Sequence, residues 1–230
     1  ALRHLDSGDR NIVTIEDPIE YNIPSIDQIE VRTRSGQTFE AGLRSLLRQD
    51  ADIVLIGEIR DEETAKIALR AAMTGQLVLS TLHATDSTSA VLRMADLGVD
   101  SYNIASALRA VVGQQLVRML CAQCRIVYEL DEQMLERLGL SGFQGELYQR
   151  PDPLSNPCLD CNSRGFLGRT GIFELLEVTP PIRDLIRDKA GIAAVTSAAL
   201  EQGMTRLWDD GLRLVRDGVI SPQELLLAVD

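Results

Sequence analysis

The stretch that most constrains the fold is Asp52–His83, which has the pattern of a strand, a helix and a second strand. Residues 52–56 form a short apolar, β-branched run that ends at Gly57, and residues 76–81 form another. The intervening segment begins with acidic residues and stops at Gly75, as helix boundary signals require. Two strands joined by a helix predict a parallel pair, and therefore an α/β sheet whose carboxyl edge can hold a ligand.

Polar side chains follow the apolar runs where each strand is predicted to end. Glu58, Arg60 and Asp61 follow the first run, and His83 follows the second. A third strand is predicted for residues 11–15, because they are rich in β-branched side chains. It is followed by the acids Glu16, Asp17 and Glu20. Solvation of a strand tip explains any one cluster, but three in succession favour a ligand site built from carboxylates.

Three boxes of the sequence resemble those of a known family. They are IEDPIE at residues 15–20, IVLIGEIRDEETA at 53–65 and TGQLVLSTLHATDS at 74–87. They look like the Asp, Walker B and His boxes of the GspE/PilB-type ATPases, which power type II secretion and type IV pilus assembly. The resemblance continues almost to the C-terminus. It implies a RecA-like P-loop NTPase core, a homohexamer, and hydrolysis of ATP with Mg²⁺.

The resemblance also implies roles for single residues, and the chemistry of ATP hydrolysis supports them. Glu20 would activate the attacking water, Glu58 would act on magnesium or its water shell, and His83 would contact the γ-phosphate. Arg60 has a simpler interpretation, which is local pairing with Asp61 or Glu58. The remaining residues expected to bind the nucleotide or magnesium are Glu16, Asp17 and Asp52.

Two arginines are candidates for action on a neighbouring subunit's nucleotide. Arg44 and Arg48 are four residues apart on a helix predicted for residues 39–49, so they share one face. A solvated helix face explains both equally well.

One expected motif is missing from the printed sequence. It contains no G-x-x-x-x-G-K-[ST] loop, and its only lysines are Lys66 and Lys189. The backbone N–H groups and the lysine that hold phosphates in such sites are therefore lacking. Because ALRHLDSGDR resembles the end of the family's P-loop helix, we expect the C-terminal part of a longer motor subunit. The chain alone is expected to bind ATP poorly and to hydrolyse none measurably.

Charge and hydropathy narrow the class of protein. The chain has 230 residues, a formal net charge of −11 and a mean hydropathy of zero. Duplex nucleic-acid binding requires a basic footprint that this composition does not offer. The sequence has neither an apolar run long enough to cross a bilayer nor a signal-peptide pattern. It therefore predicts a cytoplasmic protein, and the resemblance adds peripheral attachment to inner-membrane platform proteins of a secretion or pilus system.

Two helices are expected after the His box. The first begins at Asp86 or Ser87 and stops at Gly98. The second is predicted to run from Ser101 to about Leu120, because its apolar residues are mostly three and four apart. The segment RAVVGQQLVRML within it resembles the family's last core helix. Its polar residues, Gln114, Gln115 and Arg118, would face solvent or a neighbouring subunit.

The cysteines form two C-x-x-C pairs, and a tetrahedral zinc site would use all four of them. With four protein ligands, such a zinc is structural. Redox pairs and disulfides are the alternatives, and a cytosolic location disfavours disulfides. The insert between the pairs contains a predicted helix, 131–138. The zinc site would hold the two ends of this insert and so present it to a partner. The predicted metal ligands are Cys121, Cys124, Cys158 and Cys161.

The C-terminal third is predicted to be mainly helical. Glycines at 165, 168 and 171 among arginines suggest tight turns, and a nucleic-acid site there is disfavoured by the overall acidity. Thr179 and Pro180 start one helix, further helices cover 193–202 and 207–217, and Ser221 with Glu224 forms a capping box for the last.

The sequence thus predicts a partial RecA-like α/β core (1–120), a tetracysteine zinc module (121–163), and a return to the core with a C-terminal helical subdomain (164–230). The predicted function is ATP-driven pseudopilus assembly and protein export by the full-length parent. A pilus-extension or DNA-uptake motor is the alternative within the family, and retraction motors generally lack the cysteine module. A zinc-stabilised interaction module without hydrolysis is the alternative outside it.

Overall fold

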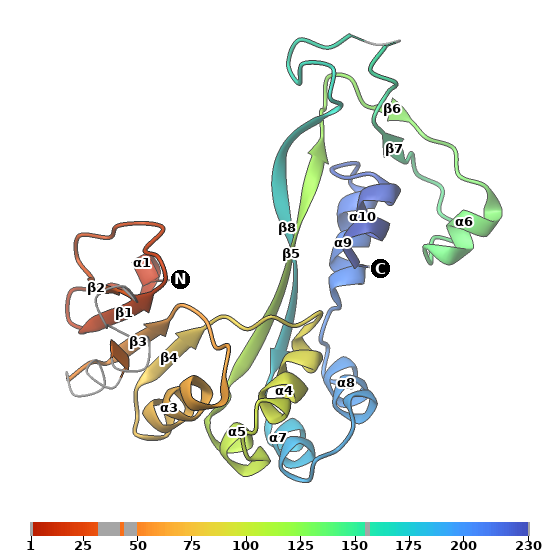
Figure 1. Ribbon diagram of the computed structural model, residues 1–230. Coiled ribbons are helices and arrows are strands. Elements are labelled where there is room, and N and C mark those ends of the chain that lie inside the picture. Colours follow the sequence, from red (N-terminus) through yellow and green to blue (C-terminus); the bar gives the residue numbers. More distant parts are fainter. Residues whose placement is uncertain (1, 32–41, 44–49, 155–156, 230) are drawn as a thin grey trace. The chain divides into compact units, whose positions relative to one another are not determined.

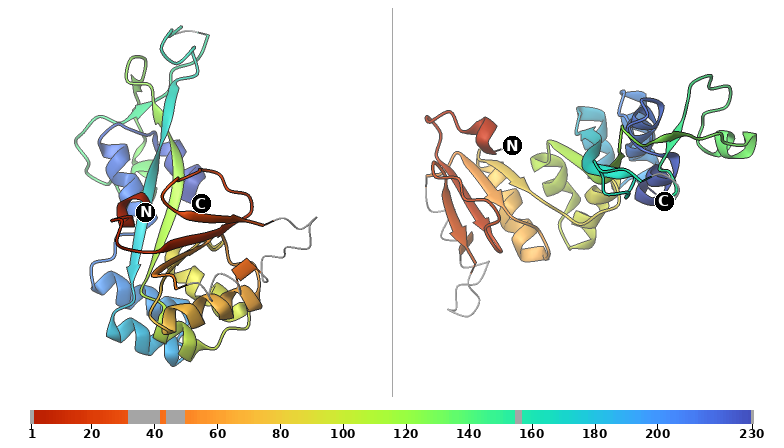
Figure 2. Two further views of the ribbon diagram at one scale, coloured as in Figure 1. Left: turned by 90° about the vertical axis from the view of Figure 1, so that its left-hand side faces the viewer. Right: turned by 90° about the horizontal axis from the view of Figure 1, so that it is seen from above.

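A computed structural model describes residues 2–31, 42–43, 50–154 and 157–229 (Figure 1, with two further views in Figure 2). Contacts divide the chain into two compact units. Unit 1 comprises Ala1–Val111 and Glu177–Glu201, and unit 2 comprises Val112–Leu176 and Gln202–Asp230. The three-part division at residues 120/121 and 163/164 stays a prediction.

Unit 1 contains a parallel sheet with the strand order β2-β1-β3-β4. Val13, Ile15, Val54 and Ile56 on its two central strands are fully buried, as expected for parallel strands covered on both faces. The strands predicted for residues 11–15, 52–56 and 76–81 are confirmed, and a further strand lies at residues 27–30. The strands are β1 (Ile12–Glu16), β2 (Asp27–Glu30), β3 (Ile53–Ile56) and β4 (Leu77–Ser80).

Three helices of unit 1 begin at aspartates. The side chains of Asp61, Asp86 and Asp100 accept a hydrogen bond from a backbone N–H in the first turn of α3, α4 and α5. In this unit α5 packs against α3, α4 and α7, and α8 packs against α4 and α7. The helices are α1 (Leu2–Leu5), α3 (Glu62–Met73), α4 (Ser87–Asp96), α5 (Ser101–Ala107), α7 (Pro180–Arg187) and α8 (Ile192–Glu201).

Unit 2 is built around a two-stranded ribbon, whose strands run in opposite directions in Figure 1. Its core joins Val117 and Ile172 of the ribbon to Leu212 and Leu225 of the last two helices. Unit 2 also contains a second, short antiparallel pair. The elements are β5 (Ala110–Leu120), β6 (Ile126–Val127), α6 (Glu132–Arg137), β7 (Tyr148–Gln149), β8 (Phe166–Glu177), α9 (Leu207–Arg216) and α10 (Pro222–Val229).

The helix predicted for residues 101–120 is wrong beyond Ala107. Leu108 has extended backbone angles, and the strand β5 follows from Ala110. Exposure along β5 alternates: Leu116 is 61% exposed whereas Val117 is fully buried. The apolar residues happened to be three and four apart, but the β-branched valines favour the strand.

The tight turns predicted around the later glycines are also wrong in part. Gly168 and Gly171 lie within β8, and only Gly165 lies in the turn before it. Gly168 adopts φ +76°, so it lets the strand pass through a backbone conformation that other residues avoid.

The insert between the cysteine pairs folds onto its own unit. The predicted helix is present as α6, and Asp131 is its N-cap. Leu138, Leu140 and Leu147 are buried in the same core as α9 and α10. Other apolar side chains of the insert stay exposed, among them Leu154 at 93%, and the presentation of the insert to a partner stays a prediction.

Candidate functional site

Three parallel strands of unit 1 end at one edge, and backbone contacts at Gly57 hold these ends together. The Gly57 N–H donates to the Ile15 carbonyl at 2.8 Å, and the Thr81 hydroxyl donates to the Gly57 carbonyl at 2.7 Å. A Cβ at position 57 would lie 3.2 Å from the Ile15 oxygen, so a glycine suits this close approach. The sequence pattern located this edge but missed the part played by Thr81.

Glu58 and His83 meet at this edge. One carboxylate oxygen of Glu58 accepts a hydrogen bond from the Arg60 guanidinium, and the other lies 3.5 Å from His83 Nε2. The hydrogen bond from Arg60 lowers the pKa of Glu58 below its ordinary value, although burial opposes this. Glu58 is therefore an anion at neutral pH, and His83, 93% exposed, is free to reach a ligand. The local pairing of Arg60 is with Glu58.

The acids after β1 lie in different surroundings. Glu16 is half-buried, and its Oε1 accepts hydrogen bonds from Thr14 at 2.6 Å and Gln28 at 2.8 Å. Asp17 is exposed, and its charge makes a small contribution to the raised pKa of Arg60, which is due mainly to Glu58. Glu20 is exposed to solvent. The structure thus places Asp17 within electrostatic range of the Glu58 cluster.

Asp52 is not brought to this edge. Asp52 lies at the amino end of β3, a strand length from Glu58, where its carboxylate accepts the Asn11 N–H at 2.9 Å. Arg44 and Arg48 lie outside the described residues. Their roles toward a nucleotide stay predictions.

The cysteines of unit 2 form a compact cluster. Their Sγ atoms all lie within 4.8 Å of one another, with Cys121 and Cys158 at 3.9 Å and Cys124 and Cys161 at 3.7 Å. All four thiols are free. Ligands 2.3 Å from a tetrahedral zinc ion would be about 3.8 Å apart, so this donor set fits such a metal.

Backbone turns and hydrogen bonds shape the cysteine cluster. The Gly165 N–H donates to Cys161 Sγ at 3.2 Å, and its carbonyl accepts the Cys121 N–H at 2.9 Å. Burial raises the pKa of Cys161, but the Gly165 N–H and the other thiols have a larger, opposite effect and lower this pKa to about 7. Burial and the neighbouring Cys161 raise the pKa of Cys124. Together the four cysteines could hold a metal ion.

The fold is similar to those of a pilus retraction motor and of the ATPase DotB. The crystal structure of the pilus retraction motor PilT with bound ADP matches with a TM-score of 0.66 and 26% identity, over 95% of this chain and 52% of PilT. The Legionella pneumophila ATPase DotB matches with a TM-score of 0.65 and 21% identity, over 98% of this chain and 54% of DotB. The chain therefore has a RecA-like α/β fold.

A family model described as "Type II/IV secretion system protein" matches residues 1–227, so the chain belongs to that family. The type II secretion system ATPase E of Vibrio cholerae is 42% identical over 98% of the chain. The type IV pilus assembly ATPase PilB of Thermus thermophilus is also 42% identical over 98% of the chain. The chain spans only 44% and 25% of these two relatives.

Proposed function

We propose that this chain is the C-terminal part of a secretion ATPase and supplies the carboxylate edge of its nucleotide site. The observation that supports this most directly is the meeting of Glu58 and His83 where three parallel strands end. Ligands of open α/β sheets bind at this edge. Carboxylates there suit a magnesium ion and the activation of water, whereas an exposed imidazole suits contact with a phosphate.

Within this proposal each residue has a distinct task. Glu58 holds magnesium or its water shell, and Arg60 fixes the orientation of the Glu58 carboxylate. Glu20 is the base that accepts a proton from the attacking water, and His83 donates a hydrogen bond to the γ-phosphate. Glu16 and Asp17 support the magnesium shell. Asp52 lies at the amino end of β3, where it binds the Asn11 N–H, so we assign it no direct contact at this edge. Arg44 and Arg48 would reach the site of a neighbouring subunit.

The biological role that we propose is type II secretion, in which ATP hydrolysis drives pseudopilus assembly and protein export. A type IV pilus motor is the alternative, since relatives of both kinds are 42% identical to the chain. In either role the full-length parent would act as a homohexamer in the cytoplasm, at an inner-membrane platform. In the described part of the chain, no helix is long and apolar enough to cross a membrane.

We further propose that Cys121, Cys124, Cys158 and Cys161 bind one structural zinc ion. The separation of their sulfur atoms and the lack of a disulfide support this. Because such binding contributes folding free energy, zinc removal should expose the cysteine segments to proteases. Chelation that leaves proteolysis near the cysteines unchanged would count against the assignment.

The experiment that tests the motor role is complementation of the intact parent in its host. Glu58→Gln keeps the size of the side chain but removes its charge, so we expect secretion or piliation to be lost. Glu63→Gln is the matched control, because Glu63 is an exposed carboxylate in the first turn of α3. Normal secretion and piliation with Glu58→Gln would contradict the motor role. The alternative, a zinc-stabilised interaction module without hydrolysis, would then be favoured.

A further inference from the structure

The strand that leads into the first cysteine pair is fastened to the C-terminal hairpin, which we define as residues 207–229 (α9, α10 and the turn between them). The Leu120 N–H donates to the Val219 carbonyl in that turn at 2.8 Å. Leu120 directly precedes Cys121, so this bond fixes the backbone beside a metal ligand. Two arginines, one on each side of the cysteine pair, make further contacts with the hairpin.

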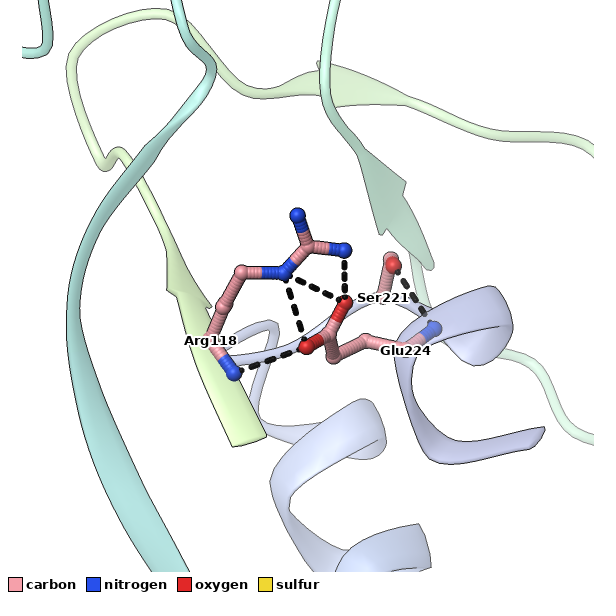
Figure 3. Close-up of polar contacts among 3 residues, drawn as sticks. All are labelled: Arg118, Ser221 and Glu224. Atoms are coloured by element: carbon pink, nitrogen blue, oxygen red, sulfur yellow. Dashed lines mark hydrogen bonds and ion pairs between the residues drawn. The ribbon is translucent and has the colours of Figure 1, made fainter. Parts of the chain in front are cut away.

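Arg118 makes the more extensive of these contacts (Figure 3). Its Nε lies 3.0 Å from both carboxylate oxygens of Glu224, its Nη2 lies 2.7 Å from Oε2, and its backbone N–H donates to Oε1 at 2.9 Å. Glu224 is buried at the start of α10, where its own N–H donates to Ser221 Oγ at 3.2 Å. The expected capping box is therefore half formed, because the Glu224 carboxylate binds Arg118 instead of returning to Ser221.

The same guanidinium also contacts the segment that follows the second cysteine pair. Arg118 Cζ lies 4.2 Å from the centre of the Phe166 ring, an arrangement typical of a cation–π contact. Phe166 follows Gly165, whose N–H donates to Cys161 Sγ. Arg118 thus connects both cysteine segments to α10.

Arg125, next to Cys124, contacts the hairpin from the other side of the pair. Its guanidinium donates to the Gly218 carbonyl and lies over the Tyr148 ring at 4.2 Å. Gly218 has φ +67°, and a Cβ there would lie 2.8 Å from the Arg125 guanidinium. A glycine in the turn therefore allows Arg125 to approach this closely.

From these contacts we propose that Arg118, Arg125 and Glu224 are positioning residues of the metal site, and that the hairpin and the metal site stabilise each other. The inference rests on the metal binding proposed above. A bound metal orders the cysteine backbone, and that backbone holds the hairpin through three contacts. Because such coupling is reciprocal, the hairpin contacts must also raise the affinity for the metal.

Hydrogen exchange of the whole chain, zinc-loaded and after chelation, tests one direction of this coupling. Amides of residues 219–229 should exchange faster after chelation by about 5–150-fold, the usual range for coupled sites. Amides of α3 in unit 1 should keep their rates and serve as the internal control. Zinc binding with unchanged exchange in the hairpin would overturn the inference alone, whereas failure of the chain to bind zinc would overturn the metal assignment as well.

Zinc affinity of variants, measured by competition with a chromophoric chelator, tests the other direction. Glu224→Gln should weaken zinc binding roughly 10–100-fold, as is typical for groups that support metal ligands. The control is Arg213→Gln, which removes the ion pairs of Arg213 with Asp210 and Asp217 in the same hairpin. Arg118→Lys keeps the charge but loses the two-pronged contact, so its zinc affinity should lie between those of wild type and Glu224→Gln. It also replaces Glu224→Gln in the test if that variant does not fold. Wild-type affinity in Arg118→Lys and in any folded Glu224→Gln would contradict the proposal.

Discussion

Single residues at the edge of the sheet set the geometry of the proposed nucleotide site. Gly57 has no side chain, so its N–H can donate a hydrogen bond to the Ile15 carbonyl of β1 just before Glu58. Glu58 is then held by Arg60 on one oxygen and faces His83 with the other. The position of the Glu58 carboxylate therefore depends on a backbone contact that no charge pattern reveals.

Gly57→Ala should destabilise unit 1 and displace Glu58. The added methyl group would lie 3.2 Å from a backbone oxygen that cannot move aside, and overpacking of this kind costs about 1–3 kcal/mol. Thermal unfolding followed by circular dichroism measures this. The matched control is Gly191→Ala, whose added Cβ meets no atom within 4 Å. Equal melting temperatures for the two variants would contradict the close-approach argument.

The Arg118–Glu224 pair predicts a pH-dependent contribution to the stability of unit 2. Burial raises the pKa of Glu224, but the hydrogen bonds from Arg118 outweigh this effect and bring the pKa below its ordinary value of 4.5. A lowered pKa in the folded state means that the contribution is complete above about pH 4.5 and is lost as pH falls through the folded-state pKa. At neutral pH we expect Glu224→Gln to cost about 1.5–3 kcal/mol, the range for hydrogen bonds to charged groups.

Urea unfolding of wild type and Glu224→Gln from pH 3 to pH 7 measures this difference. The metal-free, reduced chain should be used, because acid would otherwise release the metal and add its own effect. The difference in unfolding free energy should shrink toward pH 3. A difference that stays constant over this range would show that the carboxylate charge contributes nothing.

Elements whose local signals agree were predicted well from the sequence. The apolar runs of β1, β3 and β4 end at glycine or at polar residues, and α3 begins at Asp61 as its N-cap. The strand β5 was missed because the spacing of its apolar residues also fits a helix, although Val111, Val112 and Val117 favour a strand. The Arg118–Glu224 contact joins residues 106 apart in the chain, so no local pattern could show it.

The corrected assignment of β5 makes opposite predictions for two adjacent residues. In a helix, Leu116 and Val117 would both face inward, whereas in the strand only Val117 is buried. Val117→Ala should cost about 1–3 kcal/mol, and Leu116→Ala should change stability by less than about 0.5 kcal/mol. Chemical denaturation of the two variants measures their free energies of unfolding. Equal losses of unfolding free energy would favour a helix at these residues.

At the scale of the whole molecule, the described part of the sheet edge presents carboxylates, whereas phosphates need cations and N–H donors. Arg60, the cation beside Glu58, is already paired with it. The printed sequence has no phosphate-binding glycine loop with its lysine. Since the chain spans less than half of its relatives, we propose that the remainder of the parent supplies these groups. Measurable ATP hydrolysis by these 230 residues alone, insensitive to Glu20→Gln, would contradict this division.

The most direct test of the motor assignment is steady-state ATP hydrolysis by the purified full-length parent. Wild type, Glu20→Gln, Glu58→Gln and the control Glu63→Gln should be compared with Mg²⁺ present. General base catalysis contributes roughly 10²–10⁴-fold, so Glu20→Gln should lower the rate by that factor. Glu58→Gln should fall comparably, and Glu63→Gln should match wild type. Hydrolysis at the wild-type rate by both Glu20→Gln and Glu58→Gln would show that this edge of the sheet is not the catalytic site.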